Sequence, residues 1–531
     1  MQNEPHSNRT YKPRAWKAMT SVVAGLALLL AAQPGFGTTP TRAFAKPPPA
    51  QSPAAAATTT TAGTPATTAA ATAFDATMAL VTESTGARAF WRAGYTGKGV
   101  DIAIIDSGVA QIDGLSSPGK VRLGPDLSFE SQDPQTRNLD TNGHGTHLAG
   151  IMVGRADASS GNYSTDTRNF LGMAPDARLL SVKVADSHGR SDISQVIAAV
   201  NWVVQHKNDD GMNVRVLLLA FSTDSATPWQ RDPLIQALEV AWQKGIFVVV
   251  SAGNDGWFSK QSGTLGSPAT SPNLMVIGAT DMLGTVDYRD HVVPAFSSGG
   301  TTLRRVDMVA PGAHVVSLKS PGSYAAENFA STGAVGDRMF RGSGTSQAAA
   351  VVAGAAALVI QQREGIPPDQ LKRLLMDASR PLPRELVEVQ GRGELYLASA
   401  LRVASPLGYT SQSRVWSDGT GSLDGVRGTH RLVHRGVALS GEVDIFGHPY
   451  SSAAMASLAA NASSWSGGSW NGNQWAAGSW SASSWSSGSW SASPWSASSW
   501  SSSSWSASSW SASSWSSSSW SASSWSAFGW R

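Results

Sequence analysis

The sequence VDIAIIDSG, residues 100–108, decides the fold class of this chain. Its first six residues, Val100 to Ile105, are almost entirely apolar, which predicts a short strand buried on both faces. Similar apolar runs follow at residues 178–184, 214–220, 246–250 and 274–279. Strands that are apolar throughout, instead of alternating with polar residues, are typical of a parallel sheet covered on both sides.

Helical patterns separate these predicted strands. Apolar residues keep helical spacing in 193–204, after the capping pair Ser191-Asp192, and again in 234–241 and 371–378. Alternating strands and helices predict an α/β fold, a three-layer doubly wound sheet that is mostly parallel. In such sheets the active site lies outside the carboxyl ends of the strands. The residues that directly follow each strand are therefore the candidates for function.

Four polar side chains occupy predicted strand exits or helix starts. Asp106 follows the first strand, and Asn254 follows the strand that ends near residue 250. His144 lies in the segment NGHGTHLAG, whose glycines allow close backbone approach. Ser346 lies in GSGTSQA, which opens a long Ala-rich helix. All four therefore belong to the edge where this fold class places an active site.

Each of these residues alone has an ordinary structural explanation. A strand-end Asp can cap a turn, and a Ser at a helix start is most often an N-cap. His144 and His147 could form a metal-binding pair, but no third ligand is adjacent. Together the residues supply a chemistry: a Ser hydroxyl becomes a nucleophile when a neutral imidazole takes its proton, and a carboxylate fixes the imidazole tautomer. A carboxamide and a helix-start N–H can stabilise the oxyanion of an acyl intermediate.

Residues 75 to about 405 resemble the catalytic domain of the subtilisin-like serine proteases. The resemblance rests on segments that occur in the family's order, which are TGKGVDIAIIDSGV, NGHGTHLAGIM, LGMAPDARLLSVKV, VVVSAGNDG, DMVAPGAHVVS and GSGTSQAAAVVAGAAALV. It implies a subtilisin-like fold and a triad of Asp106, His144 and Ser346, with Asn254 as the oxyanion side chain. It also implies that an extended substrate pairs with protein near Leu219 to Thr223. The substrate-binding residues so implied are Leu219, Ala220, Phe221, Ser251, Ala252 and Gly253.

The chain departs from the family pattern at several of these positions. Ala220-Phe221-Ser222-Thr223 stands where the family has Ser-Leu-Gly-Gly, so specificity cannot be transferred. After the nucleophile, Gln347, Ala350 and Val351 replace the usual Met, Pro and His. Calcium is a common structural ion in the family, but the ligand loops match poorly and no metal ligand is assigned. The chemistry itself requires no cofactor.

The composition of the 531-residue chain narrows the classes further. Its formal net charge is only +3, it has no run of Lys and Arg suited to binding nucleic acid, and it contains no Cys.

Positive residues before the apolar run 22–32 predict a signal peptide over residues 1–45 and therefore secretion. The alternative is an uncleaved membrane anchor. Residues 46–73, rich in Pro, Ala and Thr, predict an extended linker. The peptidase domain is then predicted over residues 74–408.

Two further segments are predicted after the peptidase domain. Residues 409–460 have β character around 441–446, which predicts a small β-rich spacer, either a separate module or a collar on the protease. Residues 461–531 form a low-complexity C-terminal tail in which Trp recurs every five residues among Ser, Ala and Gly. That period presents no single face in a helix or a strand. The tail is therefore a flexible segment or a surface-retention module that stacks Trp on glycan or cell-wall polymer.

The sequence leaves three classes of function. The leading one is a secreted serine endopeptidase that cleaves protein or peptide substrates through an acyl-enzyme intermediate. The second is a peptide transamidase or ligase on the same triad, in which an amine replaces water. The third is a non-catalytic surface-adhesion protein that presents the Trp tail. The complete set of polar residues argues against the third class, whereas the altered residues after Ser346 keep the second open.

Overall fold

The computed structural model describes residues 75–131, 133–159, 161–257, 263–406, 415–429, 431–434 and 437–475. The predicted signal peptide, the predicted linker and the tail beyond residue 475 lie outside these ranges. Within these ranges, no helix combines the length and the apolar character that a membrane span requires.

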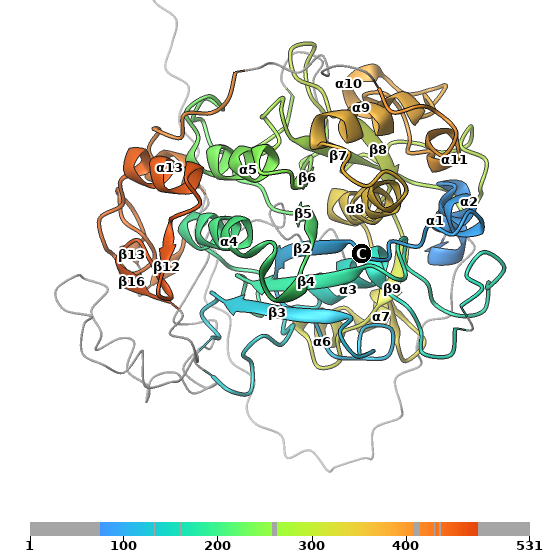
Figure 1. Ribbon diagram of the computed structural model, residues 1–531, viewed down its shortest axis with the longest axis horizontal. Coiled ribbons are helices and arrows are strands. Elements are labelled where there is room, and N and C mark those ends of the chain that lie inside the picture. Colours follow the sequence, from blue (N-terminus) through green and yellow to red (C-terminus); the bar gives the residue numbers. More distant parts are fainter. Residues whose placement is uncertain are drawn as a thin grey trace, which may run out of the picture. The chain divides into compact units, whose positions relative to one another are not determined.

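A parallel seven-stranded sheet forms the centre of the described region (Figure 1). Its spatial order is β3-β4-β2-β5-β6-β7-β8, so β5 to β8 follow one another outward on one side of β2, and on the other side β4 lies between β2 and the edge strand β3. Every neighbouring pair in it is parallel. The strands are β2 (Asp101–Asp106), β3 (Val121–Asp126), β4 (Arg178–Lys183), β5 (Val214–Leu219), β6 (Phe247–Ser251), β7 (Met275–Thr280) and β8 (Met308–Pro311). The predicted α/β doubly wound fold is confirmed.

Four helices cover the two faces of this sheet (Figure 1). Helices α3 (His144–Val153) and α8 (Thr345–Gln362) pack together on one face, and α4 (Ile193–His206) and α5 (Pro233–Gln243) pack together on the other. The remaining helices are α1 (Met78–Ser84), α2 (Ala87–Arg92), η1 (Asp209–Gly211), α6 (Tyr324–Asn328), α7 (Ala330–Gly333), α9 (Pro368–Ala378), α10 (Val387–Gln390), α11 (Leu397–Ala400), α12 (Leu423–Arg427) and α13 (Ser452–Ala460).

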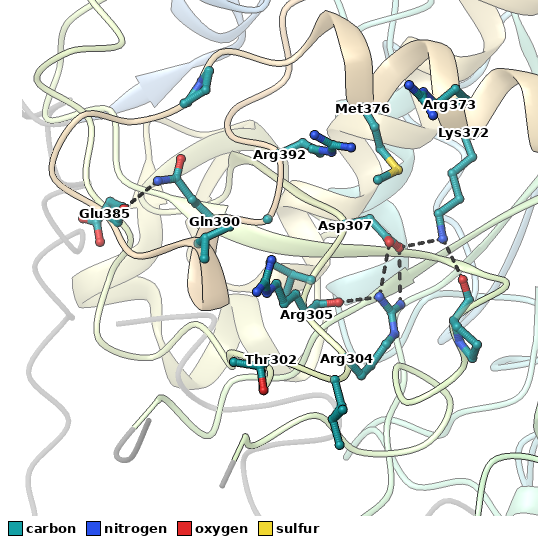
Figure 2. Close-up of a pocket in the computed structure, with 16 residues that line it drawn as sticks. Thr302, Arg304, Arg305, Asp307, Lys372, Arg373, Met376, Glu385, Gln390 and Arg392 are labelled. Atoms are coloured by element: carbon teal, nitrogen blue, oxygen red, sulfur yellow. Dashed lines mark hydrogen bonds and ion pairs between the residues drawn. The ribbon is translucent and has the colours of Figure 1, made fainter. Parts of the chain in front are cut away.

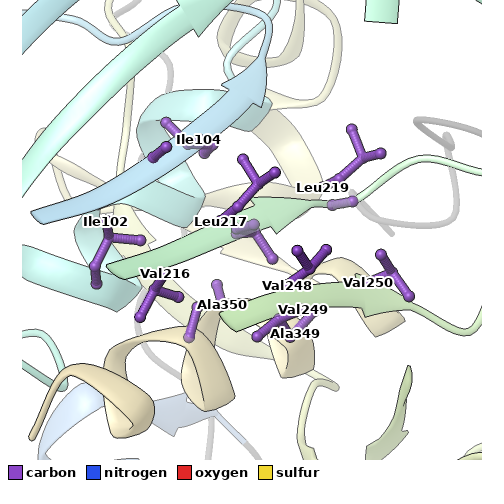
Figure 3. Packing of buried hydrophobic residues seen from close by; sticks show 14 of the residues in the cluster. Ile102, Ile104, Val216, Leu217, Leu219, Val248, Val249, Val250, Ala349 and Ala350 are labelled. Carbon is purple, nitrogen blue, oxygen red and sulfur yellow. The ribbon is translucent and has the colours of Figure 1, made fainter. Parts of the chain in front are cut away.

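The core lies between the sheet and helix α8. Figure 3 shows apolar side chains of β2, β5 and β6 beside Ala349 and Ala350 of α8. Both alanines and the strand residues Val216 and Val249 are fully buried. Because alanine is short, α8 approaches the strands closely, and this fixes the position of the helix start that carries Ser346.

A second, smaller sheet supports the start of α8. Its order is β1-β9-β11-β10, with β1 (Ala76–Thr77), β9 (Val315–Leu318), β10 (Ala334–Val335) and β11 (Met339–Gly342). Strand β11 leads through Ser343 and Gly344 into α8. Arg341 in β11 forms a buried ion pair with Asp75, which ties the first described residue to the strand before the helix.

Residues 415–475, the C-terminal segment, pack on α4 and α5 instead of forming a separate module (Figure 1). Arg427 of α12 is fully buried, and its Nε donates to Oδ2 of Asp192 at 2.8 Å. Asp192 caps the start of α4, so the ion pair joins the segment to the catalytic core. The segment predicted as a β-rich spacer contains the helices α12 and α13 as well as the two-residue strands β12 (Val433–His434) and β13 (Val437–Ala438).

The first three Trp repeats also belong to this packed region. Trp465, Trp470 and Trp475 are buried in the main core cluster and lie on or beside three short antiparallel strands. The strands are β14 (Trp465–Ser466), β15 (Ser469–Trp470) and β16 (Asn473–Gln474). The predicted boundary at residue 461 therefore falls within the packed region, because these indoles fill space between α4 and the C-terminal segment.

Candidate active site

The four candidate residues lie where the strands of the main sheet end and the helices begin. Asp106 is the last residue of β2, and His144 is the first residue of α3. Ser346 is the second residue of α8, and Asn254 lies three residues beyond β6. All four side chains are largely buried, with residue exposures between 1% for Asp106 and 9% for Asn254.

Asp106 and His144 are joined directly. Nδ1 of His144 lies 3.0 Å from both carboxylate oxygens of Asp106. Because a carboxylate can only accept, Nδ1 carries the proton and Nε2 is left as the basic nitrogen. Ser107 fixes the carboxylate in turn, since its backbone N–H donates to Oδ1 at 2.8 Å. The imidazole is thus oriented as a general base requires.

Glycines permit this close approach between β2 and α3. A Cβ atom at Gly145 would lie 2.1 Å from the carbonyl oxygen of Gly108, so no side chain fits at that position. Gly143 has φ +107°, a conformation that favours glycine. The glycines on both sides of His144 therefore allow α3 to begin close enough to β2 for His144 to reach Asp106.

Asp140 is a positioning residue that sequence reasoning missed. Its Oδ1 accepts from the Gly143 N–H at 2.7 Å and from the Ser107 hydroxyl at 2.8 Å. Its Oδ2 accepts from the Thr146 N–H at 2.7 Å. One buried carboxylate thus joins the end of β2 to the start of α3. Only the acidic residue four positions before His144 could have signalled it in the sequence.

His147 has a structural role. Its Nε2 lies 3.2 Å from the Val315 carbonyl oxygen and 3.1 Å from that of Phe340, so it donates toward both. Burial and the neighbouring His144 lower the pKa of His147 to about 3. Within the described ranges, no group of three or more His, Asp or Glu side chains is arranged to hold a metal ion.

Asn254 is oriented by the residue that precedes Ser346. Its Oδ1 accepts from the Thr345 N–H at 2.9 Å and from the Thr345 hydroxyl at 3.0 Å. The amide nitrogen Nδ2 must then point away from Thr345. A Cβ atom at Gly344 would lie 3.4 Å from this nitrogen, which places it beside the start of α8. The carboxamide therefore presents its donor at the edge that carries Ser346.

The expected substrate-binding residues lie at the ends of two neighbouring strands. Leu219 pairs with Val250, so the stretch after β5 and the stretch after β6, residues 251–253, emerge side by side. Leu219, Ala220 and Ala252 are fully buried, and Phe221 is 1% exposed. These side chains belong to the buried core.

Residues that depart from the family pattern lie behind the site. Ala350 and Val351 are fully buried, and α8 continues through both to Gln362. Gln347 is 1% exposed, and neither of its amide atoms has a hydrogen-bond partner in the described part of the chain. Its Oε1 lies 2.8 Å from where a Cβ atom of Gly344 would be. The replacements therefore leave Ser346 at the helix start.

The fold and the polar side chains at its carboxyl edge are those of a serine endopeptidase. The model of the subtilase family matches residues 97–399. Serine protease AprX of Bacillus subtilis (strain 168) is 34% identical over 320 residues, covering 59% of this chain and 69% of its own. Subtilisin Savinase of Lederbergia lenta is 32% identical over 289 residues, covering 54% and 86%. The chain belongs to the subtilase family and is a subtilisin-like serine endopeptidase.

A solved structure is also similar to part of the chain. The crystal structure of a cold adapted subtilisin-like serine proteinase matches 57% of this chain and 90% of its own. The two chains are 27% identical over the match, and the TM-score is 0.41.

Proposed function

We propose that this chain is a secreted endopeptidase in which Ser346 is the nucleophile, His144 the general base and Asp106 the residue that orients it. The hydrogen bond between His144 and Asp106 carries this proposal, because it leaves Nε2 as the basic nitrogen of a residue on α3, the helix that packs against α8. Ser346 Oγ has no hydrogen bond within the described ranges. The hydrogen bond between a nucleophile and its general base often forms or shortens only when a substrate binds.

The proposed reaction has two halves. Ser346 Oγ attacks the scissile carbonyl carbon while its proton passes to Nε2 of His144. Nδ2 of Asn254 and the backbone N–H of Ser346 stabilise the oxyanion that forms. The C–N bond then breaks, and His144 returns the proton to the leaving amine. In the second half, water gives a proton to His144 and attacks the ester, and Ser346 is released with its proton. Every catalytic group in these steps belongs to the chain, and only the substrate and water come from outside.

The substrate would bind as an extended strand. Residues 219–223 would pair with its backbone, and residues 251–253 would border the pocket for the side chain before the scissile bond. Thr223 already forms an isolated antiparallel bridge with Ser267, and the Thr223 N–H donates to the Ser267 carbonyl oxygen at 2.8 Å. This bridge fixes the far end of the proposed substrate-binding stretch.

One experiment tests the proposed function against the two alternatives. The purified protein is treated with a serine-directed fluorophosphonate probe, and its products from a mixed peptide substrate are analysed by mass spectrometry. Labelling at Ser346 with new free termini supports an endopeptidase. Joined peptides would indicate transamidation, and absence of labelling would indicate a non-catalytic adhesion protein.

We expect Asn254→Ala to lower kcat by roughly 10²–10³, the range established for removal of the same kind of donor in subtilisin. KM should change little, because the hydrogen bond strengthens in the transition state. Asn254→Asp is the matched variant, since it keeps an oxygen for Thr345 but replaces the donor. It should lose at least as much kcat. An effect confined to KM in both variants would make Asn254 a substrate contact only.

We expect kcat/KM to fall as the medium is acidified, because a protonated His144 cannot accept the Ser346 proton. His147 does not confuse this measurement, since its pKa of about 3 keeps it neutral until far lower pH. Initial rates on a soluble peptide across the pH range provide the test. A rate that stays flat from about pH 5 to 9 would argue against an imidazole base.

The N-terminal and C-terminal regions support secretion and surface retention as further parts of the proposal. The apolar run 22–32 after positive residues has the pattern of an export signal. Trp465, Trp470 and Trp475, which are the tail tryptophans within the described ranges, are buried in the packed region. Binding to glycan or cell-wall polymer would therefore rest on the eleven beyond Trp475, where weak stacking contacts at a fixed spacing add avidity.

A further inference from the structure

A basic pocket opens at the amino edge of the sheet, opposite the candidate active site. Its cavity volume is about 700 Å³, within the range of small-molecule sites. Asp307, which directly precedes β8, lines the pocket together with the loop before it, helix α9 and the loop that contains Gly391 and Arg392 (Figure 2). The carboxyl edge, which carries Asp106 and Asn254 after β2 and β6, is the opposite edge of the same parallel sheet.

The side chains around this pocket carry an excess of positive charge. Its lining contains two acidic side chains, Asp307 and Glu385. The basic side chains in the lining are Arg304, Arg305, Lys372, Arg373 and Arg392. The formal excess is therefore three positive charges. Like charges around one concave surface attract counter-ions of the opposite sign.

Three of the five cations already have carboxylate partners. Arg304 Nη1 lies 3.2 Å from Asp307 Oδ1, and Lys372 Nζ lies 3.0 Å from Asp307 Oδ2. The same Oδ2 also accepts from the Val276 N–H at 2.8 Å. Arg373 is paired with Asp377 at 2.5 Å. Asp307 is thus fully occupied and cannot neutralise another cation.

Arg305 and Arg392 are the two cations of the pocket lining without a carboxylate partner in the described part of the chain. Neither guanidinium has a hydrogen bond or ion pair in the described part of the chain, and no dashed line joins either guanidinium in Figure 2. Nε of Arg305 is buried without a partner. Glu385 is engaged elsewhere, because its Oε1 accepts from the Val293 N–H at 2.9 Å. Arg392 is exposed, whereas the unpartnered buried Nε of Arg305 carries a desolvation cost that an acceptor oxygen would relieve.

We propose that this pocket binds a phosphate-class oxyanion that carries two or more negative charges. A guanidinium presents several N–H donors in a planar fork that matches the oxygens of a phosphoryl group. Arg305 and Arg392 would supply those donors from two different loops. The Arg304–Asp307–Lys372 network would keep the floor of the pocket rigid. The proposal does not depend on the catalytic roles, because the two sites lie at opposite edges of the sheet.

Calorimetric titration of the full-length protein with sodium tripolyphosphate, at constant ionic strength, tests this proposal. We expect saturable binding at one site, and weaker binding of orthophosphate, which carries less charge. Arg305→Gln and Arg392→Gln should each weaken tripolyphosphate binding about tenfold or more, because a charge-assisted hydrogen bond contributes roughly that factor. Both variants should keep the kcat/KM of the parent protein on a soluble peptide.

Arg373→Gln is the matched control, because Arg373 lines the same pocket but is already paired with Asp377. Its loss should change affinity much less than loss of Arg305 or Arg392. Equal losses of tripolyphosphate affinity in all three variants would show that only net charge matters. That result would overturn the proposed recognition by Arg305 and Arg392. Citrate that binds as tightly as tripolyphosphate would overturn the phosphate preference. Absence of saturable binding to the parent protein would overturn the site itself.

Discussion

Ser346→Ala should lose nearly all peptidase activity while the protein stays folded. In subtilisin, removal of the nucleophile lowers kcat by about 10⁶, and we expect a loss of the same order here. The residual rate would come from substrate binding and the oxyanion donors. The fold should not suffer, because Ser346 Oγ makes no hydrogen bond within the described ranges.

Ser343→Ala provides the matched control for this measurement. Ser343 lies three residues earlier on the same connection between β11 and α8, and its hydroxyl accepts from the His314 N–H at 2.9 Å. Its loss removes a local hydrogen bond but no reacting group, so most of the activity should remain. Both variants are assayed on a soluble peptide and melted by circular dichroism. Proteolysis that persists in a clean preparation of Ser346→Ala would falsify the assignment of the nucleophile.

The central strands could be predicted because burial on both faces leaves a plain apolar signal. Strands β2, β4, β5, β6 and β7 lie inside the sheet and coincide with the predicted runs. The edge strands β3 and β8 escaped prediction. Strand β3 (VRLGPD) is partly exposed and contains Gly124 and Pro125, which usually end a strand. Strand β8 is short and ends in Pro311. Edge position, which only the fold reveals, makes both sequences acceptable.

The candidate site was predictable where chemistry constrains a residue and its neighbours in sequence. The short segments around His144 and Ser346 carry their glycines with them, so the pattern is visible along the chain. Asp140 is different, because its partners Ser107, Gly143 and Thr146 come together only when the end of β2 packs against the start of α3. A hydrogen-bond network that crosses elements leaves no periodic signal in the sequence.

The short strands that carry the first Trp repeats had a signal in their turn residues. Gly467-Gly468 and Asn471-Gly472 all have positive φ, from 50° to 81°, and they connect the three short strands. Such pairs are the strongest short-range sign of a hairpin. Most later repeats carry Ser and Ala at the corresponding places, although Gly478 and Gly488 repeat the second glycine of the first turn. The regular spacing of Trp hides this difference between the first repeats and the rest.

Two truncations should separate these parts of the tail. Deletion of residues 463–531 removes Trp465, Trp470 and Trp475, which are exposed by 4%, 0% and 1%. A buried indole covers about 150–250 Å², or roughly 4–6 kcal/mol as an upper bound at 25 cal/mol/Å². The deletion also breaks the hydrogen bond from Trp465 Nε1 to the Ala198 carbonyl of α4, at 2.9 Å. We expect Tm to fall on the order of 10 °C.

Deletion of residues 476–531 should leave Tm and soluble-peptide hydrolysis nearly unchanged, because it keeps all three buried tryptophans. It removes the remaining eleven, so a retained enzyme should become free in the medium. Fractionated cultures of the full chain and of this truncation are assayed for peptidase activity in the medium and in the cell or insoluble-polymer fraction. Equal distribution of both forms would make the tail beyond Trp475 an inert spacer. Loss of peptide hydrolysis in this truncation would mean that packing essential to the enzyme continues beyond Trp475, since the longer deletion alone is expected to disturb α4 and the C-terminal segment.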